Sequence, residues 1–280
     1  MKTLFITAIP EIALHAEGAG VDVIFIDMET RGKAARQGHL DTHKAAHSLA
    51  DVAALAPRLS RAELMVRVNP PWAGSAQEAR NAIAAGATRL MLPMFNHAAE
   101  VTAFKQTAGS TPVTLLVETA AALARLPVIL PLLGPQDRVH FGLNDLSLDM
   151  RLDFLFEVLG GRLLDGPSAQ CREAGIAFGI GGVGRVGQGD LPADWILGEH
   201  ARLGSDWVIL SRAFHGRAAS LAELQAQIDL SAELCAIRQV ADEWLIAPHD
   251  ALYENHARLA RRAAQIARQS ENPELSQPEH

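Results

Sequence analysis

The sequence predicts a (β/α)8 barrel, the TIM fold, with a helical extension after it. Eight short apolar runs alternate with stretches rich in Ala and Leu over residues 1–216. The runs are apolar throughout rather than at every second position, which indicates burial on both faces and therefore a parallel sheet. Eight strand–helix units in a segment of this length fit a barrel of ordinary size, whereas a doubly wound sheet seldom needs eight strands.

The elements of the barrel follow from this alternation. We expect strands near residues 2–6, 21–28, 64–69, 89–93, 113–118, 139–144, 176–181 and 206–211, and helices at Ser75–Ala85, Ala98–Gln106, Ala120–Leu126 and Gly166–Ala174. Gly86 and Gly175 stand shortly before predicted strands, as glycines that end a helix do. They mark the face of the barrel where we expect little chemistry.

The pattern changes near residue 218. Leu221–Leu245 and Asp250–Gln269 are typical of two helices with no strand between them. The second carries apolar residues such as Leu259 and Ala263 at near-helical spacing, so this face can pack on the barrel or on a partner subunit. We therefore expect a barrel domain (1–218), a helical extension (219–269) that forms a homo-oligomer, and a polar, disordered tail (270–280).

Bulk composition excludes several classes of protein. The chain has 280 residues, 49% of them hydrophobic, which is enough for a sizeable core. Its net charge of −7 argues against nucleic acids and anionic membranes as partners. Cys171 and Cys235 lack a CxxC spacing, which argues against a disulfide scaffold or a cysteine zinc site and fits the cytoplasm. The apolar stretch Leu123–Leu133 is too short to span a bilayer.

Two acidic residues end two of the predicted strands. Glu118 closes the run Thr114–Glu118, and Asp145 follows the run Val139–Asn144. A carboxylate at the C-terminal end of a buried parallel strand is costly unless it binds something, and in a barrel these ends share one mouth. Two carboxylates with open positions suit Mg²⁺ or Mn²⁺. The alternative is that the two acids only open the next helices, as a first-turn acid and an N-cap.

Other polar residues gather at the same predicted mouth. They are Asp27 and Glu29 after the second strand, Arg67 at the end of the third, Asn144 beside Asp145, Gly182 and Arg185 after the seventh, and Ser211 after the eighth. Arg67 could clamp a substrate carboxylate, or it could form an ion pair with Asp27 or Glu29. The glycine-rich stretch around Arg185 could cradle a phosphate or form a plain lid.

The positions of the histidines and lysines argue against a histidine zinc site and against a Schiff-base mechanism. His39, His43 and His47 recur every four residues, and three histidines of one helix rarely converge on one zinc ion. We favour the interpretation that the three histidines lie on a solvent-exposed helix face. One of them could still reach the site as a catalytic base. None of the four lysines ends a predicted strand, which argues against a Schiff-base aldolase. The GxGxxG-like stretch 182–187 lacks an acidic ribose ligand after a paired next strand, so a dinucleotide site is a poor fit.

The strand-end motifs resemble those of the HpcH/HpaI aldolase and citrate lyase β-subunit family. The motifs are Phe25-Ile26-Asp27-Met28-Glu29, Arg67-Val68-Asn69-Pro70, Leu116-Val117-Glu118-Thr119 and Phe141-Gly142-Leu143-Asn144-Asp145-Leu146-Ser147. The resemblance covers about residues 1–216 and implies a barrel in which Glu118 and Asp145 bind Mg²⁺ or a similar ion and Arg67 contacts substrate. The chain departs from the family at Thr30, where the aldolases have His and the citrate lyase branch has Asp.

The resemblance implies a metal-dependent carbon–carbon lyase or aldolase that acts on a 2-oxo acid through a pyruvyl-type enolate. We assign catalytic roles to Arg67, Glu29 and Asp27, and substrate contacts to Asn144, Gly182, Arg185 and Ser211. The glycine-rich loop suggests a phosphorylated or sugar-derived substrate. Two alternatives stay open: an acyl-CoA thioester lyase, and a non-catalytic barrel that binds a phosphorylated ligand.

Overall fold

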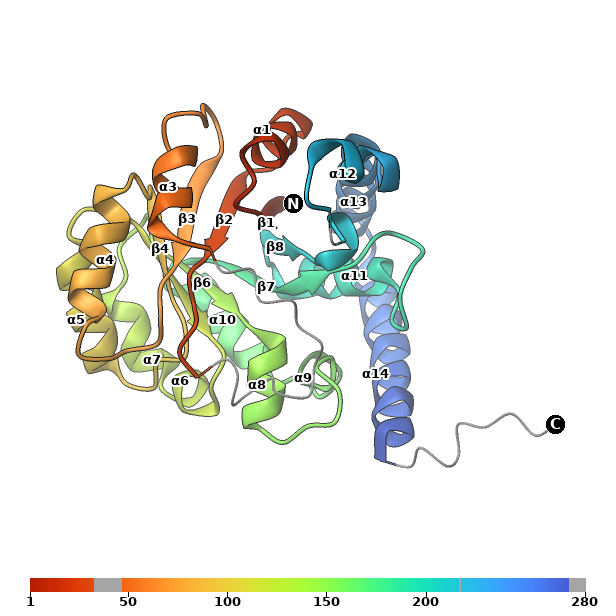
Figure 1. Ribbon diagram of the computed structural model, residues 1–280. Coiled ribbons are helices and arrows are strands. Elements are labelled where there is room, and N and C mark those ends of the chain that lie inside the picture. Colours follow the sequence, from red (N-terminus) through yellow and green to blue (C-terminus); the bar gives the residue numbers. More distant parts are fainter. Residues whose placement is uncertain (33–46, 217, 272–280) are drawn as a thin grey trace.

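The computed structural model shows a closed barrel of eight parallel strands, paired in chain order from β1 to β8 (Figure 1). It describes residues 1–32, 47–216 and 218–271. The strands are β1 Lys2–Ile6, β2 Val23–Asp27, β3 Glu63–Arg67, β4 Arg89–Leu92, β5 Val113–Val117, β6 Arg138–Phe141, β7 Ala177–Val183 and β8 Trp207–Leu210. Each strand overlaps its predicted range, and the predicted (β/α)8 fold is confirmed.

Helices surround the barrel (Figure 1). They are α1 Pro10–Ala19, α3 Leu49–Leu55, α4 Ser75–Ala84, α5 Ala98–Ala108, α6 Ala120–Ala124, α7 Leu126–Ile129, α8 Leu143–Asp149, α9 Glu157–Gly160, α10 Asp165–Glu173 and α11 Ala193–Leu203, with the 3₁₀ helices η1 Leu130–Leu132 and η2 Arg212–Phe214. Gly86, with φ of +106°, donates its N–H to Ile83 and so ends α4, as the sequence predicts.

Strand β3 shows how the interior is layered. Alternate residues of a strand point to opposite faces, so Leu64 and Val66 enter the core between strands and helices, while Met65 belongs to a smaller core inside the barrel. Glu63 lies below Met65, and Arg67 lies above it. The same five residues therefore supply a charge to each end of the barrel and an apolar side chain to its middle.

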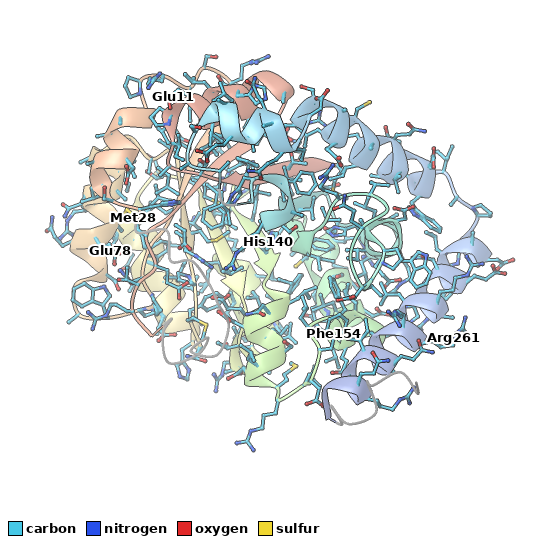
Figure 2. The ribbon with its side chains drawn as sticks, turned by 45° about the vertical axis from the view of Figure 1, so that its right-hand side comes forward. Glu11, Met28, Glu78, His140, Phe154 and Arg261 are labelled. Atoms are coloured by element: carbon cyan, nitrogen blue, oxygen red, sulfur yellow. The ribbon has the colours of Figure 1, made fainter. Side chains whose placement is uncertain are left out.

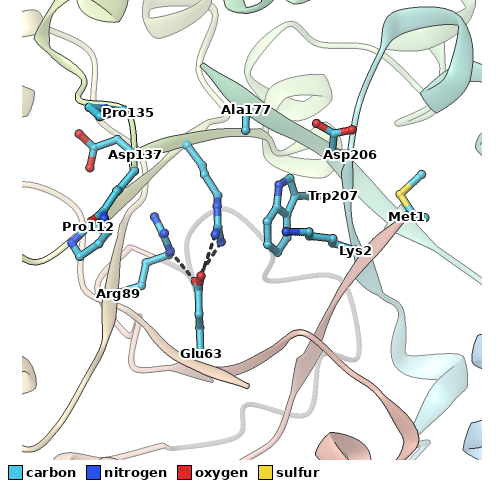
Figure 3. A pocket seen from close by; sticks show the side chains of 12 residues that line it. Met1, Lys2, Glu63, Arg89, Pro112, Pro135, Asp137, Ala177, Asp206 and Trp207 are labelled. Carbon is cyan, nitrogen blue, oxygen red and sulfur yellow. Dashed lines mark hydrogen bonds and ion pairs between the residues drawn. The ribbon is translucent and has the colours of Figure 1, made fainter. Parts of the chain in front are cut away.

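The N-terminal end of the barrel is closed by ion pairs above a cavity of about 760 Å³ (Figure 3). Glu63 accepts hydrogen bonds from Arg89 (2.7 Å) and from both terminal nitrogens of Arg138 (2.9 and 2.7 Å). Arg138 stacks on Trp207 with 3.7 Å from its guanidinium carbon to the ring centroid. Because Glu63 binds both arginines, these contacts tie β3, β4 and β6 together at this end of the barrel.

The C-terminal extension contains three helices where the sequence predicted two. They are α12 Leu221–Gln227, α13 Leu230–Leu245 and α14 His249–Glu271. The prediction of one helix over Leu221–Leu245 is therefore wrong. Ile228 is extended, with φ of −154° and ψ of 139°, and the Asp229 side chain accepts the N–H of Ala232 to begin α13. The extended residue Ile228 ends α12, and Asp229 directly after it is the N-cap of α13.

Helix α14 packs along α9 and α11 of its own chain (Figure 1). Its apolar residues Leu259 and Ala263 are buried there. Asn255 donates to the Trp195 carbonyl at 2.9 Å, and a Cβ on Gly198 would lie only 2.3 Å from the Asn255 nitrogen. The predicted apolar face thus packs on the barrel, and an oligomer through these helices stays a prediction.

The ends of the predicted regions differ slightly from the structure. Helix α14 runs to Glu271, two residues into the predicted tail, and residues 272–280 lie outside the described residues. Over the part of the chain that is described, no helix is long and apolar enough to cross a membrane.

Candidate active site

Glu118 lies at the C-terminal end of β5 and is buried, with 3% of its surface exposed. It does not cap the helix that follows, because the side chain of Thr119 accepts the Ala122 N–H at 3.0 Å and fills that place. One Glu118 carboxylate oxygen, Oε1, accepts the N–H of Met94 at 3.0 Å. The carboxylate is thus held at the mouth, and capping the next helix does not explain its presence there.

The backbone on both sides of Glu118 is shaped around its carboxylate. Met94 has φ of +52°, a left-handed conformation that is costly for a residue with a Cβ. On the other side, a Cβ on Gly142 would lie 2.9 Å from Glu118 Oε2. A glycine at position 142 therefore leaves this second oxygen accessible from the side of β6.

Asp145 lies in the first turn of α8, whose N-cap is Gly142. It is also buried, with 6% exposed. Asn144 donates its side-chain N–H to Asp145 Oδ1 at 3.0 Å, so the predicted substrate-binding residue Asn144 orients the carboxylate beside it. Asp145 is a first-turn acid rather than an N-cap, which leaves its carboxylate able to act at the mouth.

Arg67, at the end of β3, is held by the acids of β2. Its Nε donates to Asp27 Oδ1 at 2.9 Å and its Nη2 donates to Asp27 Oδ2 at 2.7 Å, a bidentate pair. Nε also lies 3.5 Å from Glu29 Oε2. The ion pair weighed in the sequence is therefore present. Since a guanidinium has five N–H groups, the pair leaves others for a ligand.

Electrostatics couple these residues, which follow the four strands β2, β3, β5 and β6. The pKa of Glu118 is raised to about 8, mainly by burial; the charge of Arg67 opposes this shift, and the charges of Asp145 and Glu29 add to it. Burial alone would lower the pKa of Arg67, but the charge and hydrogen bonds of Asp27, with Glu29 and Glu118, raise it above its usual value. The structure thus brings together five of the six acidic and basic residues predicted for the mouth, and the sixth, Arg185, is paired with Glu233 instead.

A divalent cation fits Glu118 and Asp145 by their chemistry. Two carboxylates that repel each other in a buried site gain from a cation between them, and Mg²⁺ is commonly held by one or two carboxylates with water and substrate filling the other positions. In the residues described, no group of three or more His, Cys, Asp or Glu side chains is arranged to hold a metal ion. The pair would therefore form an open site that substrate oxygens complete.

Thr30, at the position where the resemblance in the sequence implies His or Asp, is bound to the neighbouring strand end. Its hydroxyl donates to Asn69 Oδ1 at 3.3 Å, and the N–H groups of Thr30 and Arg31 donate to the same oxygen at 2.9 and 2.8 Å. Asn69 itself is held by Glu78 of α4, to which its side chain donates at 2.7 Å. The residues that directly follow β2 are therefore fixed to the end of β3.

His47 approaches the same place. Its Nδ1 accepts the backbone N–H of Asp27 at 3.0 Å, which puts the proton of a neutral ring on Nε2. His39 and His43 lie outside the described residues. The spacing of four residues drew attention to the three histidines in the sequence. It could not show that His47 is the one that contacts the end of β2.

The other predicted substrate ligands lie around the rim. Arg185 donates from Nε to Glu233 of α13 at 2.8 Å, and its Nη2 contacts the same carboxylate. Ser211 caps η2 by accepting the Ala213 N–H at 3.3 Å. Gly182 follows an irregularity in the pairing of β7 with β8. Their contact with substrate stays a prediction.

The sequence missed Met94 as a ligand of Glu118. Its contribution is a backbone N–H, and any residue type offers one. The run Leu92-Pro93-Met94 therefore carried no signal beyond the proline that ends the strand.

The chain is thus a (β/α)8 barrel with two carboxylates and an arginine at its C-terminal mouth, the end at which barrel enzymes carry their active sites. The chain belongs to the HpcH/HpaI aldolase/citrate lyase family, whose model matches residues 3–158. The resemblance noted in the sequence is thereby confirmed, and membership supports a lyase or aldolase activity.

A solved structure of an HpcH/HpaI aldolase from Desulfitobacterium hafniense DCB-2 is similar in fold. It superposes with a TM-score of 0.58 at 14% sequence identity, over 89% of this chain and 94% of that chain. At this identity the likeness concerns the fold. No curated protein matches the sequence.

Proposed function

We propose that this protein is a carbon–carbon lyase or aldolase that depends on a divalent metal and acts on a 2-oxo acid. The observation that carries the proposal is the mouth of the barrel, where Glu118 and Asp145 end two adjacent strands opposite the Arg67–Asp27 pair. Family membership supports the type of reaction. The proposed intermediate is the enolate of a pyruvyl unit.

Glu118 and Asp145 would hold Mg²⁺ or Mn²⁺. When bound, such an ion stabilises the negative charge that develops on the oxygen of the 2-oxo group. Arg67 would bind the substrate carboxylate through the N–H groups that Asp27 leaves open. Asp27 in turn fixes the plane of the guanidinium, and a fixed donor orients its ligand better than a mobile one does.

The chain offers two carriers for the proton that must move when the carbon–carbon bond breaks. Glu29 lies beside Arg67, with 1% of its side chain exposed. His47 carries its ring proton on Nε2 because Nδ1 accepts from Asp27, so this ring could donate a proton. Either residue would take the place of the histidine that related aldolases have at the position of Thr30.

We also propose a cytoplasmic homo-oligomer. The support for the location is that both cysteines are free, with Cys171 buried and Cys235 exposed. The support for the oligomer is an apolar corner between α13 and α14, where Leu245 is 66% and Ile246 87% exposed.

The experiment that tests the function is proton exchange of pyruvate. The protein is incubated with pyruvate and Mg²⁺ in D₂O, and deuteration of the methyl group is followed by NMR. We expect exchange that needs the metal and is lost in Glu118→Gln, because the variant removes a charged ligand without changing the shape of the side chain.

Glu173→Gln is the matched control. Glu173 is exposed at the end of α10, so this variant removes the same charge away from the mouth and should exchange at the rate of the unchanged protein. Absence of exchange from a protein that binds Mg²⁺ would refute the enolate mechanism. In that case the mouth would be a binding site for an acid and not a catalytic one.

A further inference from the structure

At the rim of the mouth, an arginine is stacked on a tryptophan. The guanidinium carbon of Arg31 lies 4.3 Å from the ring centroid of Trp72. Both side chains are exposed, and Trp72 keeps 42% of its surface accessible. Within the described part of the chain Arg31 forms no ion pair, in contrast to Arg67 and Arg185, whose charges are held by Asp27 and Glu233.

The two elements that carry this stack are fixed to each other. Arg31 follows β2, and its N–H donates to Asn69 Oδ1 at 2.8 Å. Asn69 lies two residues after Arg67, and its side chain donates to Glu78 Oε1 at 2.7 Å. Glu78 Oε2 accepts the indole N–H of Trp72 at 3.1 Å. Hydrogen bonds and one stack thus join β2, β3 and α4 in a closed circuit beside the mouth (Figure 2 labels Glu78 and Met28).

The indole is also held from below. The backbone N–H of Trp72 donates to Ser75 Oγ at 2.8 Å, which fixes the backbone that carries the indole. A Cβ on Gly74 would lie 2.2 Å from the Trp72 ring, so the ring lies against the backbone at this glycine. A tryptophan held by its indole N–H and by this close contact gives the guanidinium stacked on it a rigid platform.

A guanidinium stacks on an aromatic ring through its face, so the N–H groups in its plane remain available to a ligand. These donors match the two oxygens of a carboxylate or a phosphate, and little side-chain entropy is lost when the guanidinium is already fixed. Arg31 is two residues from Glu29, so its Cα stands within about 7 Å of a residue that lines the mouth, and its N–H is bound to Asn69, two residues after Arg67. A ligand held by Arg67 could therefore reach Arg31 with its far end.

We propose that Arg31, supported by Trp72, is a specificity-determining residue that binds an anionic group, a carboxylate or a phosphate, at the end of the 2-oxo acid remote from its keto group. This inference rests on the proposed function, since it takes the 2-oxo acid to lie with its own carboxylate at Arg67. It assigns the class of substrate: a 2-oxo acid with a second negative charge.

The test is equilibrium binding of two acids of equal length in the presence of Mg²⁺. 2-Oxoglutarate ends in a carboxylate and 2-oxopentanoate in a methyl group, so the ratio of their dissociation constants, measured by calorimetry, isolates the far group. We expect Arg31→Gln to shift this ratio against 2-oxoglutarate by about tenfold or more, because a charge-assisted hydrogen bond is lost. The affinity for 2-oxopentanoate should change less than about twofold.

Three further variants separate charge from platform. Arg31→Lys should keep part of the preference, since it retains the charge but loses the bidentate geometry. Trp72→Leu should weaken the preference, and Trp72→Phe should keep most of it. Arg80→Gln removes an exposed arginine of the neighbouring helix α4 and should leave the ratio unchanged.

4-Phosphono-2-oxobutanoate, which carries a phosphonate in place of the far carboxylate of 2-oxoglutarate, distinguishes in the same titration a phosphate-like group from a carboxylate as the preferred group. A ratio that is the same in Arg31→Gln as in the unchanged protein would overturn the inference, as would an equal loss for both acids. Pyruvate exchange in D₂O keeps the two proposals apart. If pyruvate exchanges but the preference for 2-oxoglutarate does not depend on Arg31, only this inference is refuted. If the preference depends on Arg31 but pyruvate does not exchange, only the proposed lyase activity is refuted.

Discussion

The pair of Asp27 and Arg67 offers the sharpest test of how the mouth is built. Asp27 accepts both hydrogen bonds of the bidentate pair and also the N–H of Glu29 at 3.1 Å. The substitution Asp27→Asn keeps the size of the side chain. It replaces one carboxylate oxygen by an NH₂ group that faces a guanidinium donor, and it removes the charge.

The expected cost follows from burial and from the remaining partner. The side chains of Arg67 and Asp27 are 15% and 11% exposed, so little water can replace the lost bond. Removing one partner of a buried ion pair costs about 3–5 kcal/mol. Glu29 Oε2 lies 3.5 Å from Arg67 Nε and still balances part of its charge in the variant. We therefore expect a loss of unfolding free energy near the lower end of this range, about 3 kcal/mol.

The same change should affect catalysis. We expect Asp27 to orient the guanidinium for the substrate carboxylate. If the variant loses about 3 kcal/mol of transition-state stabilisation for this reason, kcat/KM for pyruvate exchange falls by roughly 100-fold. Stability is measured by urea denaturation followed by circular dichroism, and exchange by NMR at a temperature where the variant stays folded.

Glu63→Gln is the control, because it breaks a similar network at the opposite end of the barrel (Figure 3). Its side chain is 33% exposed, so we expect a smaller loss of about 1–2 kcal/mol. Exchange should continue at the unchanged rate. An Asp27→Asn variant that loses stability but exchanges pyruvate as fast as the Glu63→Gln variant would show that the pair is structural, and the reasoning would be wrong.

Two further predictions concern the interior and the extension. Burial lowers the pKa of His140, inside the barrel, from 6.5 to about 4 (labelled in Figure 2). The neutral ring therefore contributes stability that is present above pH 6.5 and is lost as the pH falls toward 4. His140→Leu should reduce the loss of unfolding free energy over this range by about 3 kcal/mol in urea titrations, and parallel curves would contradict this. Gly198→Ala would press on Asn255 and should destabilise the chain by about 2 kcal/mol, whereas Gly166→Ala, in open space on α10, should not; equal melting temperatures of the two variants would contradict the close packing of α14.

Much of the barrel could be predicted because strand burial leaves a direct trace in the chain. A parallel strand covered on both faces needs apolar residues at nearly every position, and the runs end where the strands do. Glu118 and Asp145 interrupt this pattern at the C-terminal ends, which is why they were found. The break between α12 and α13 was missed, because Asp229 reads as an ordinary polar residue on a helix face until its cap is seen.

The roles of the rim residues depended on contacts between distant segments. Arg185 was expected to face substrate, yet Glu233 is 48 residues away in the chain and holds its guanidinium. The sequence offered no reason to assign Arg31 a role, since an exposed arginine after a strand is common. Its position over Trp72 becomes visible only when two loops stand side by side.

The sequence alone determined the number of strands, their order, and the charged residues that end them, because these follow from local burial along the chain. It also predicted the family, since the strand-end motifs are contiguous. The tertiary structure decided which charges meet: that Asp27 takes Arg67, that Met94 offers its N–H to Glu118, and that α14 packs on its own barrel. The physical reason is that hydrogen bonds and ion pairs act over about 3 Å, and only the closed barrel brings residues dozens of positions apart within that reach.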